Sequence, residues 1–309
     1  MWRTVLANNV IDRIPEPGTG AHTVRALVED LAAALRQGGI SDPNRTAMDV
    51  ISSLVGESRS WPVANRDAAL DTLIVSAARD AGDRLCAGAP FAYAVGTAQF
   101  RHLTLAVDER VLIPRPETEV LVGEIIDRME ASYGDRSWGT AVDIGTGSGA
   151  IALSLAAEGR FQRVIATDAS ADALAVARLN RERCSHMLEA EVELRHGSFL
   201  APVSGERVTI VVSNPPYIAF SEIEALPASV RDWEPPVALL SGHNGMAATE
   251  VIIRDSAAIL ASGGLLALEV DERRASLAAE LMMRHGGYTG IGVRLDLTGR
   301  ERFVLATRQ

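Results

Sequence analysis

The sequence predicts an α/β fold in which a small helical domain precedes a doubly wound parallel sheet. Two observations carry this prediction. After Gly139, strand-like and helix-like segments alternate over short links: TAVDIG, SGAIALSLAAEG, RVIATD, ADALAVARLNRER, VELRH and VTIVVSN. Such alternation is typical of a parallel sheet with helices on both faces. Between His22 and Leu85, by contrast, apolar residues recur at helical spacing.

The helical stretch is expected to form a domain of about three helices over residues 21–89. Its apolar residues recur as Val24, Leu27, Leu31 and Leu35, then Met48, Ile51, Leu54 and Val55, then Leu70, Leu73, Ile74 and Ala77. Pro43 follows a glycine pair and suits the first turn of a helix. Residues 1–20, which end in PEPGTG, are expected to form an N-terminal tail.

Residues 90–115 are predicted to form a β-hairpin linker, because apolar residues recur there with a period of two: Phe91, Tyr93 and Val95, then Leu103, Leu105 and Val107. A helix is predicted to begin near Pro116, with acidic residues in its first turn, where the helix dipole favours them. The domain that carries the sheet therefore spans residues 116–309. In its last part, the strands LLALEV and RFVLAT are expected to flank a helix near residues 277–283.

Composition narrows the classes of function. The formal net charge is −10 and the sequence pI is near 5.2, whereas proteins that hold nucleic acids by neutralising phosphates usually have a basic face. All 30 basic residues are arginines, which excludes a catalytic lysine, a Schiff base and the lysine of a P-loop. Direct sequence-specific binding of nucleic acid is therefore not expected.

The cysteines and the apolar runs indicate a cytoplasmic protein without a metal site. Cys86 and Cys184 are far apart and lack the C-x-x-C spacing of zinc ligands, and they suggest no disulfide framework. The longest charge-free run, residues 85–100, has 16 residues and is too short for a spanning helix, which needs roughly 18. Charged residues from Arg3 onwards interrupt the N-terminus, so no signal peptide is expected.

A glycine-rich turn ends the first strand of the alternating region. Asp143, Gly145, Gly147 and Gly149 form a D-x-G-x-G-x-G pattern, and glycines there let the backbone approach a ligand. The second strand ends at Asp168, which is placed to bind the two hydroxyls of a ribose. These features favour a cofactor that contains a nucleoside, and a nicotinamide cofactor is among the types that fit. The alternatives are glycines that serve packing alone and an Asp168 that caps the next helix.

The stretch VVSNPPYI, residues 211–218, ends a predicted strand with an asparagine and two prolines. Asn and Pro are common in plain turns. The carboxyl ends of parallel strands, however, meet at one edge of a sheet, where ligands bind. The Asn214 side chain and the Pro215 carbonyl would then face the reactive end of the cofactor, an arrangement for which a dehydrogenase has no obvious use.

The chain contains six motifs in this order: VLIPRPETE, VDIGTGSGAIALSLA, VVSNPPYI, EPPVALLSG, GGLLALEV and GRERFV. Together they resemble the peptide chain release factor glutamine methyltransferases, the PrmC or HemK family, over about residues 22–307. The resemblance implies the Rossmann-like fold of class I S-adenosylmethionine-dependent methyltransferases, preceded by a helical domain for substrate recognition. It also implies the family's activity, which serves translation termination. With S-adenosylmethionine, and leaving S-adenosylhomocysteine, the family methylates the side-chain amide nitrogen (N5) of the glutamine in the Gly-Gly-Gln motif of class 1 release factors.

By position, the resemblance assigns roles to residues of several motifs. The cofactor-binding residues would be Asp143, Gly145, Thr146, Gly147, Ser148, Gly149, Asp168, Phe199 and Asn214. The substrate-binding residues would be Asn214, Pro215, Pro216 and Tyr217, of which Asn214 and Pro215 would carry catalysis. Tyr217 would wall the substrate slot or, alternatively, anchor the core. No metal is implied.

Two further groups of residues each have two alternative roles. Arg115, Glu117 and Glu119 match a family motif, and both a direct role and an ion-paired helix start are consistent with them. For Trp233 and Glu234, packing is favoured over a place at the border of the cofactor pocket.

The NPPY loop suits the chemistry of an amide. An amide nitrogen is a poor nucleophile because its lone pair is delocalised into the carbonyl. The Asn214 side-chain oxygen and the Pro215 carbonyl would each accept a hydrogen bond from one of the two N–H groups of the amide. They would so direct the nitrogen lone pair toward the methyl group. No strong base is then required, because the nitrogen becomes acidic as the N–C bond forms.

Four positions depart from the family's usual pattern: Ser198, Thr209, the HNGM segment at residues 243–246, and Asp271. None lies in the glycine turn or the NPPY loop, so methyl transfer remains the prediction while the substrate stays open. The first alternative is a paralogue that methylates another protein, a peptide or a small-molecule amide or amine. The second is a nucleic-acid amino methyltransferase that acts on a flipped-out base. The third is a non-enzymatic helical adaptor.

Overall fold

The computed structural model describes residues 22–309, so the predicted tail at residues 1–20 lies outside the described residues. The described chain forms two compact units. The helical unit comprises the described residues up to Thr97 together with Ala228–Trp233, and the sheet unit comprises Ala98–Pro227 and Glu234–Gln309. Each unit has an apolar core of its own. The segment Ala228–Trp233 thus groups with the helices, although the sequence placed it in the range of the sheet domain.

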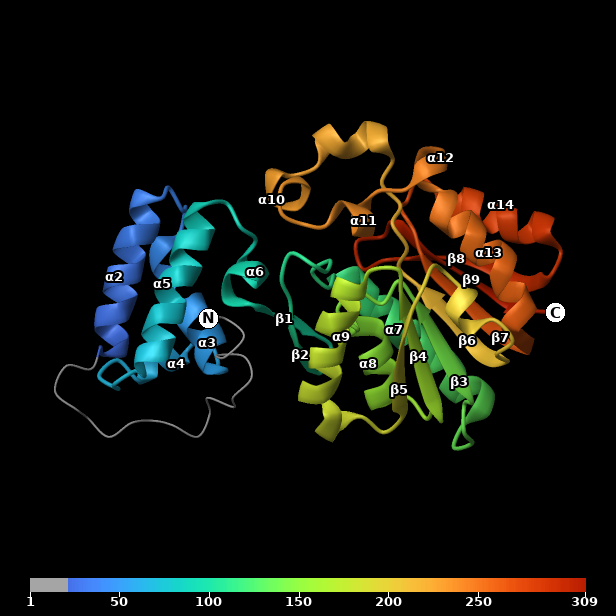
Figure 1. Ribbon diagram of the computed structural model, residues 1–309, viewed down its shortest axis with the longest axis horizontal. Helices are drawn as coiled ribbons and strands as arrows, with labels where there is room; N and C mark the ends of the chain where they lie inside the picture. Colours follow the sequence, from blue (N-terminus) through green and yellow to red (C-terminus); the bar gives the residue numbers. More distant parts are fainter. Residues whose placement is uncertain (1–21) are drawn as a thin grey trace. The chain divides into compact units, whose positions relative to one another are not determined.

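The helical unit contains α2 (Val24–Gln37), α3 (Pro43–Val55), α4 (Trp61–Ala64), α5 (Thr72–Cys86), α6 (Phe91–Val95) and α10 (Ala228–Arg231) (Figure 1). Local side chains begin the helices: Thr23 accepts a hydrogen bond from the Ala26 N–H, and Asp71 accepts one from the Leu73 N–H. Most of the apolar residues at helical spacing are buried or half-buried, and Leu27, Leu35 and Ile51 are fully buried in the core, whereas Leu73 is exposed.

The linker differs from the prediction at its start. Residues Phe91–Val95 form the short helix α6 instead of a strand, and the hairpin consists only of β1 (Thr97–Phe100) and β2 (Leu103–Ala106). Over five residues, alternation of large and small side chains does not separate strand from helix. Gly96, with φ +76°, ends the helix in the left-handed conformation that glycine adopts without strain.

In residues 22–309 the remaining strands form one seven-stranded sheet of order β5-β4-β3-β6-β7-β9-β8. The strands are β3 (Thr140–Ile144), β4 (Arg163–Asp168), β5 (Glu191–His196), β6 (Val208–Ser213), β7 (Leu260–Glu269), β8 (Tyr288–Leu295) and β9 (Glu301–Arg308). β3 to β7 are parallel, whereas β9 runs antiparallel to both β7 and β8. The predicted α/β class is confirmed, and β8 is a strand that the sequence analysis did not predict.

Helices cover both faces of the sheet, as Figure 1 shows. On one face, α7 (Pro116–Tyr133) and α8 (Ala150–Glu158) pack with strand residues such as Ala141 and Ile210. On the other, α13 (Ala247–Ile259) and α14 (Ala275–His285) pack with Val142 and Val211. Adjacent strand residues point to opposite faces, so strands buried on both sides read as continuous apolar runs.

The other helical segments of the sheet unit are α9 (Ala171–Arg183), α11 (Pro236–Leu239), α12 (Gly242–Gly245), η2 (Ser185–Met187), η3 (Ala201–Val203) and η4 (Phe220–Ala225). None of the helices described here combines the length and the apolarity that a membrane span requires.

Candidate active site

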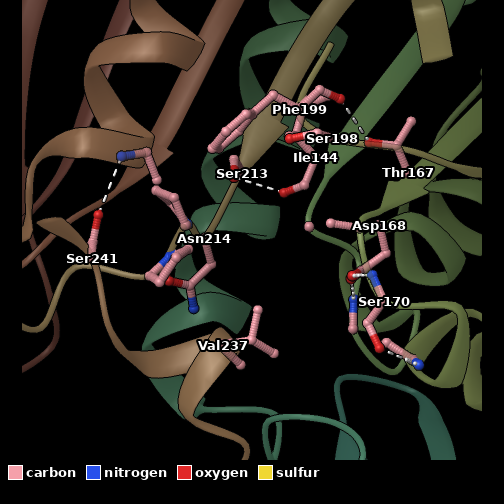
Figure 2. A pocket seen from close by; sticks show the side chains of 18 of the residues that line it. Ile144, Thr167, Asp168, Ser170, Ser198, Phe199, Ser213, Asn214, Val237 and Ser241 are labelled. Carbon is pink, nitrogen blue, oxygen red and sulfur yellow. Dashed lines mark hydrogen bonds between the residues drawn. The ribbon is translucent and has the colours of Figure 1, made fainter. Parts of the chain in front are cut away.

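A pocket of about 340 Å³ lies at the carboxyl ends of β3, β4 and β6 (Figure 2), within the range of small-molecule sites, roughly 300–1,000 Å³. β3 pairs with β4, the next strand along the chain, on one side and with β6 on the other. Strand order therefore reverses here, and open α/β sheets bind their ligands at this kind of position. The lining includes Gly145, Gly147, Asp168, Phe199, Asn214, Pro215 and Pro216 from the predicted site.

The glycine side of the pocket exposes bare backbone. Gly145 and Gly147 line the pocket with φ of +73° and +56°, and a Cβ added to either would meet nothing within 4 Å. The N–H groups of Gly145 and Thr146 both donate to the Thr167 carbonyl at 2.9 Å, which holds the turn against β4. The space above both glycines is thus free for a ligand that approaches the main chain closely.

Asp168, the last residue of β4, is held by backbone donors on both oxygens. Oδ2 accepts from the Gly147 N–H at 2.9 Å, and Oδ1 accepts from the Ser170 N–H at 2.8 Å. The alternative that Asp168 caps the next helix is wrong, because Ser170 is the N-cap of α9 and accepts from the Ala173 N–H. The carboxylate therefore lines the pocket in a fixed orientation, with further lone pairs for ligand hydroxyls.

Four predicted cofactor residues do not line the pocket: Asp143, which supports the turn, and Thr146, Ser148 and Gly149, which belong to it. Asp143 is fully buried, and its Oδ2 accepts from Thr146 Oγ1 at 2.6 Å and from the Ala152 N–H at 3.2 Å. Among the described residues its Oδ1 has no hydrogen-bond partner. Burial raises the pKa of Asp143 to about 7, although both hydrogen bonds oppose the shift.

Phe199 closes the pocket on the side of β4 and β5. Its φ of +46° is one that residues other than glycine rarely adopt, and its carbonyl accepts from Thr167 Oγ1 at 3.4 Å. Ser198, one of the four departures from the family pattern, lines the same wall. The unusual backbone at Phe199 presents this residue to the pocket, where the resemblance placed it.

The asparagine side begins where β6 ends. Ser213 Oγ donates to the Ile144 carbonyl at 2.7 Å and so ties the ends of β6 and β3 together. In Figure 2, Asn214 and Asp168 lie across the pocket from each other. Asn214 Nδ2 donates to Thr118 Oγ1 at 3.1 Å, and Thr118 Oγ1 is 2.7 Å from Glu269 Oε2. The predicted acceptor residue is thus anchored by two residues that the sequence analysis did not assign to the site.

Tyr217 does not line this pocket. It packs behind the loop, with the guanidinium of Arg302 6.0 Å from the centre of its ring. Burial raises the pKa of Tyr217 to about 12, and the nearby charge of Glu269 adds to the shift. The phenol therefore stays neutral at physiological pH, and its role as a wall of the substrate slot remains a prediction.

The helix start at Arg115 is ion-paired. Arg115, the N-cap of α7, places Nη2 2.5 Å from Oε1 of Glu234, whose side chain is buried. Burial raises the pKa of Glu234, and Arg115 opposes the shift. Glu117 lies 3.7 Å from Arg300 Nη2. Trp233 belongs to the helical unit, where Arg84 lies 5.8 Å from the centre of its ring.

Two of the departures from the family pattern meet at one arginine behind the NPPY loop. Arg274 Nε donates to the Asn244 carbonyl at 2.7 Å, Nη1 to Asp271 Oδ1 at 3.1 Å, and Nη2 to Glu222 Oε2 at 2.8 Å. Gly245 packs against the same loop, because a Cβ there would lie 2.1 Å from the Tyr217 carbonyl oxygen. The altered residues of the HNGM segment and Asp271 therefore lie outside the pocket lining, in contrast to Ser198.

Sequence reasoning missed part of the pocket wall. The lining also includes Arg110, then Val111 and Leu112 at the start of VLIPRPETE, and residues 237–242 from EPPVALLSG, apart from Leu239. The two motifs were recognised only by their resemblance to the family, and Arg110 lies outside both. Their order along the chain carries no information about which of them meet in space.

Comparison with known proteins agrees with this geometry. A family model, the methyltransferase small domain, matches residues 122–226. The chain is 37% identical over 289 residues to the release factor glutamine methyltransferase of Moorella thermoacetica, covering 93% of this chain and 99% of that protein. It is 36% identical over 283 residues to the protein of the same name from Rhodopirellula baltica, covering 91% and 95%. The methyltransferase fold also appears in a solved structure, the hMettl16 catalytic domain in complex with MAT2A 3'UTR hairpin 1. That structure has a TM-score of 0.52 and 17% identity over 79% of this chain and 84% of that chain.

Proposed function

This chain belongs to the release factor glutamine methyltransferase family, and we propose that it uses S-adenosylmethionine to methylate the N5 amide nitrogen of the glutamine in the Gly-Gly-Gln motif of a class 1 release factor. One observation carries the proposal. Asn214, an amide side chain with a tethered nitrogen, lines the same pocket as the bare backbone of Gly145 and Gly147 and the carboxylate of Asp168. The proposed cofactor site and a fixed hydrogen-bond acceptor would thus share one cavity.

The glycine side fits the cofactor. Gly145 and Gly147 both line the pocket, and no atom lies within 4 Å of the place where either would carry a side chain. Asp168 would accept hydrogen bonds from the two ribose hydroxyls, and Phe199 would lie against the adenine. When bound, S-adenosylmethionine supplies an electrophilic methyl group on a positively charged sulfur, and S-adenosylhomocysteine remains after transfer.

The asparagine side fits the substrate amide. Asn214 Oδ1 and the Pro215 carbonyl would accept hydrogen bonds from the two N–H groups of the glutamine side chain. These two hydrogen bonds would fix the plane of the amide and direct the nitrogen lone pair. The loop has prolines at two positions, and prolines have no N–H that would compete for these acceptors. Formation of the N–C bond at the expense of the S–C bond would make the nitrogen acidic, and its proton would pass to water, so this loop needs no strong base.

Transfer of a labelled methyl group tests the proposal directly. The purified chain is incubated with a class 1 release factor and S-adenosylmethionine labelled in its methyl group, and the modified peptide is located by mass spectrometry. We expect one methyl group on the glutamine of the Gly-Gly-Gln motif. The matched control is a release factor in which that glutamine is alanine, which should take up no label.

Two outcomes would overturn the proposal. Equal labelling of the glutamine and alanine release factors would place the methyl group elsewhere. No labelling of the release factor, either alone or bound to the ribosome, would assign this chain to a paralogue with another amide or amine as its substrate.

A further inference from the structure

Three segments that are distant in sequence meet behind the asparagine of the pocket. Thr118 lies in the first turn of α7, Asn214 follows β6, and Glu269 is the last residue of β7. In the parallel register of β6 and β7, Ser213 pairs with Leu268, so the residues after them are level at the edge of the sheet. Thr118 and Glu269 are both almost fully buried. The contact between Thr118 and Glu269 is therefore buried, whereas Asn214 is half-buried and reaches the pocket.

The direction of the hydrogen bonds follows from what each group can donate. An ionised carboxylate accepts only, and a hydroxyl has one hydrogen to give. The Thr118 hydroxyl therefore donates to Glu269 Oε2, at 2.7 Å, and has only lone pairs left for its second partner. That partner must be a donor, and it is the Asn214 amide NH₂, at 3.1 Å.

This chain of bonds determines which end of the Asn214 amide the pocket receives. A primary amide has a donor end and an acceptor end, and rotation about its last bond exchanges them. With Nδ2 bonded to Thr118, the acceptor oxygen Oδ1 is the end that remains for a ligand. In the reversed orientation, the NH₂ group of Asn214 would meet the NH₂ group of a substrate amide, so that two donors would face each other.

We propose that Thr118 and Glu269 are positioning residues, which hold the Asn214 amide with its oxygen toward the substrate nitrogen. The proposal rests on the proposed function, in which Asn214 accepts a hydrogen bond from the substrate amide. Neither residue touches the substrate. Both act through Asn214, and their contribution should appear in the rate of methyl transfer and not in the affinity for S-adenosylmethionine.

The surroundings of Glu269 make the arrangement sensitive to pH. Burial raises the pKa of Glu269 to about 7; the nearby charge of Glu117 adds to the shift, while Arg302 and Arg115 oppose it. The charge of the same carboxylate also raises the pKa of the nearby Tyr217 phenol. Once protonated, Glu269 can donate to Thr118, whose own hydrogen then becomes free to point at Asn214. The orientation of the amide is therefore enforced only while Glu269 is ionised.

A pair of substitutions separates the hydroxyl of Thr118 from its volume. Thr118→Val keeps the shape and removes the hydroxyl, so it should lower kcat by roughly tenfold or more, by analogy with the loss of a group that orients a metal-binding side chain. Thr118→Ser keeps the hydroxyl and removes a methyl group, so it should recover most of the turnover. A residue needed only for packing would give the opposite ranking, and that ranking would overturn the proposal.

The matched control is Thr249→Val, a change of the same kind at another buried position of the sheet unit. Among the described residues, the Thr249 hydroxyl has no hydrogen-bond partner. Its removal should leave kcat unchanged. Affinity for S-adenosylmethionine, measured by calorimetry, should be the same for Thr118→Val, Thr249→Val and the unmodified chain. Loss of this affinity in Thr118→Val would show a general disturbance of the pocket and would contradict the proposal.

An NMR measurement without substrate distinguishes failure of this inference from failure of the proposed function. The side-chain NH₂ signals of Asn214 in the ¹⁵N-labelled full chain are identified by their absence in Asn214→Ala. They should shift in Thr118→Val and stay in place in Thr118→Ser. Unshifted signals in Thr118→Val would overturn the positioning role, whatever substrate the enzyme uses. If the signals shift while the release factor takes up no methyl group, the arrangement stands and only the proposed substrate is wrong.

Discussion

The two sides of the pocket are built in different ways. On the glycine side, Asp168 accepts from backbone N–H groups that lie 2 and 21 residues away in sequence. On the asparagine side, Asn214 is held by the side chain of Thr118, 96 residues earlier in the chain, and Thr118 bonds in turn to Glu269, from which it is 151 residues away in sequence. The first side is built within one continuous stretch of strand, turn, helix and strand, from β3 through α8 to β4. The second exists only when α7, β6 and β7 have come together.

The difference assigns separate tasks to the two sides. Backbone groups with no side chain above them can surround a nucleoside closely, and this side would determine whether the cofactor binds. A buried array of side chains can set the direction of one amide, and this side would determine whether the bound cofactor reacts. Substitutions on the two sides should therefore affect different measured quantities.

The largest effect on the glycine side is expected from Gly145→Ala. The new Cβ would occupy the space above the turn, so affinity for S-adenosylmethionine should fall by roughly tenfold or more. A tenfold loss corresponds to about 1.4 kcal/mol of binding free energy. Calorimetric titration of the folded variant measures the effect.

Gly56→Ala is the matched control for backbone strain. Gly56 also has φ of +73°, and a Cβ there also meets nothing within 4 Å, but it ends α3 in the helical unit. Both substitutions should cost stability, by about 1–2 kcal/mol for an alanine in the left-handed region. Only Gly145→Ala should lose cofactor affinity. Equal affinity in the two variants would mean that the cofactor does not lie against the glycine turn.

A smaller effect is expected from pH. The pKa of Glu269 is raised by burial from 4.5 to about 7, so kcat should fall as the pH decreases through about 7. Glu269→Gln cannot titrate at this position and should lose this acid limb. Because burial also raises the pKa of Asp143 to about 7, the profile is measured at saturating cofactor, where changes beneath the glycine turn affect it least. An acid limb that persists unchanged in Glu269→Gln would assign it to another group.

Stability should change with pH in the opposite direction to turnover. A carboxyl with a raised pKa binds its proton more tightly in the folded chain than in the unfolded one. The contribution of Asp143 and Glu269 to the free energy of unfolding is thus fully present below about pH 4 and is lost as the pH rises through about 7. These two groups add less stability at pH 8 than at pH 5.5, whereas kcat is higher at pH 8. Urea unfolding at pH 5.5 and at pH 8 measures the free energy of unfolding, which sums the contributions of all titrating groups. The difference between the unmodified chain and Glu269→Gln isolates the contribution of Glu269.

The sequence predicted what depends on local pattern. The alternation of strands and helices, the glycine turn and Asp168 could be placed because parallel strands bring their carboxyl ends to one edge. The bonds from Thr118 to Asn214 and Glu269 could not, because they depend on the packing of α7 against the sheet. Short segments also resisted prediction. α6 has only five residues and β8 contains two glycines, so their local sequence favours no single conformation. Contacts with the rest of each unit determine the conformation that they adopt.

The paired measurement on Asn214→Ala tests most directly whether the two sides have separate tasks. Turnover with the release factor and affinity for S-adenosylmethionine are measured on the same folded preparation. We predict that kcat falls by on the order of 10²–10³, as when one preorganised hydrogen-bonding group is removed from an active site, while the affinity for S-adenosylmethionine is largely kept. Robust turnover in Asn214→Ala, or a loss of cofactor affinity as large as the loss of turnover, would contradict the account.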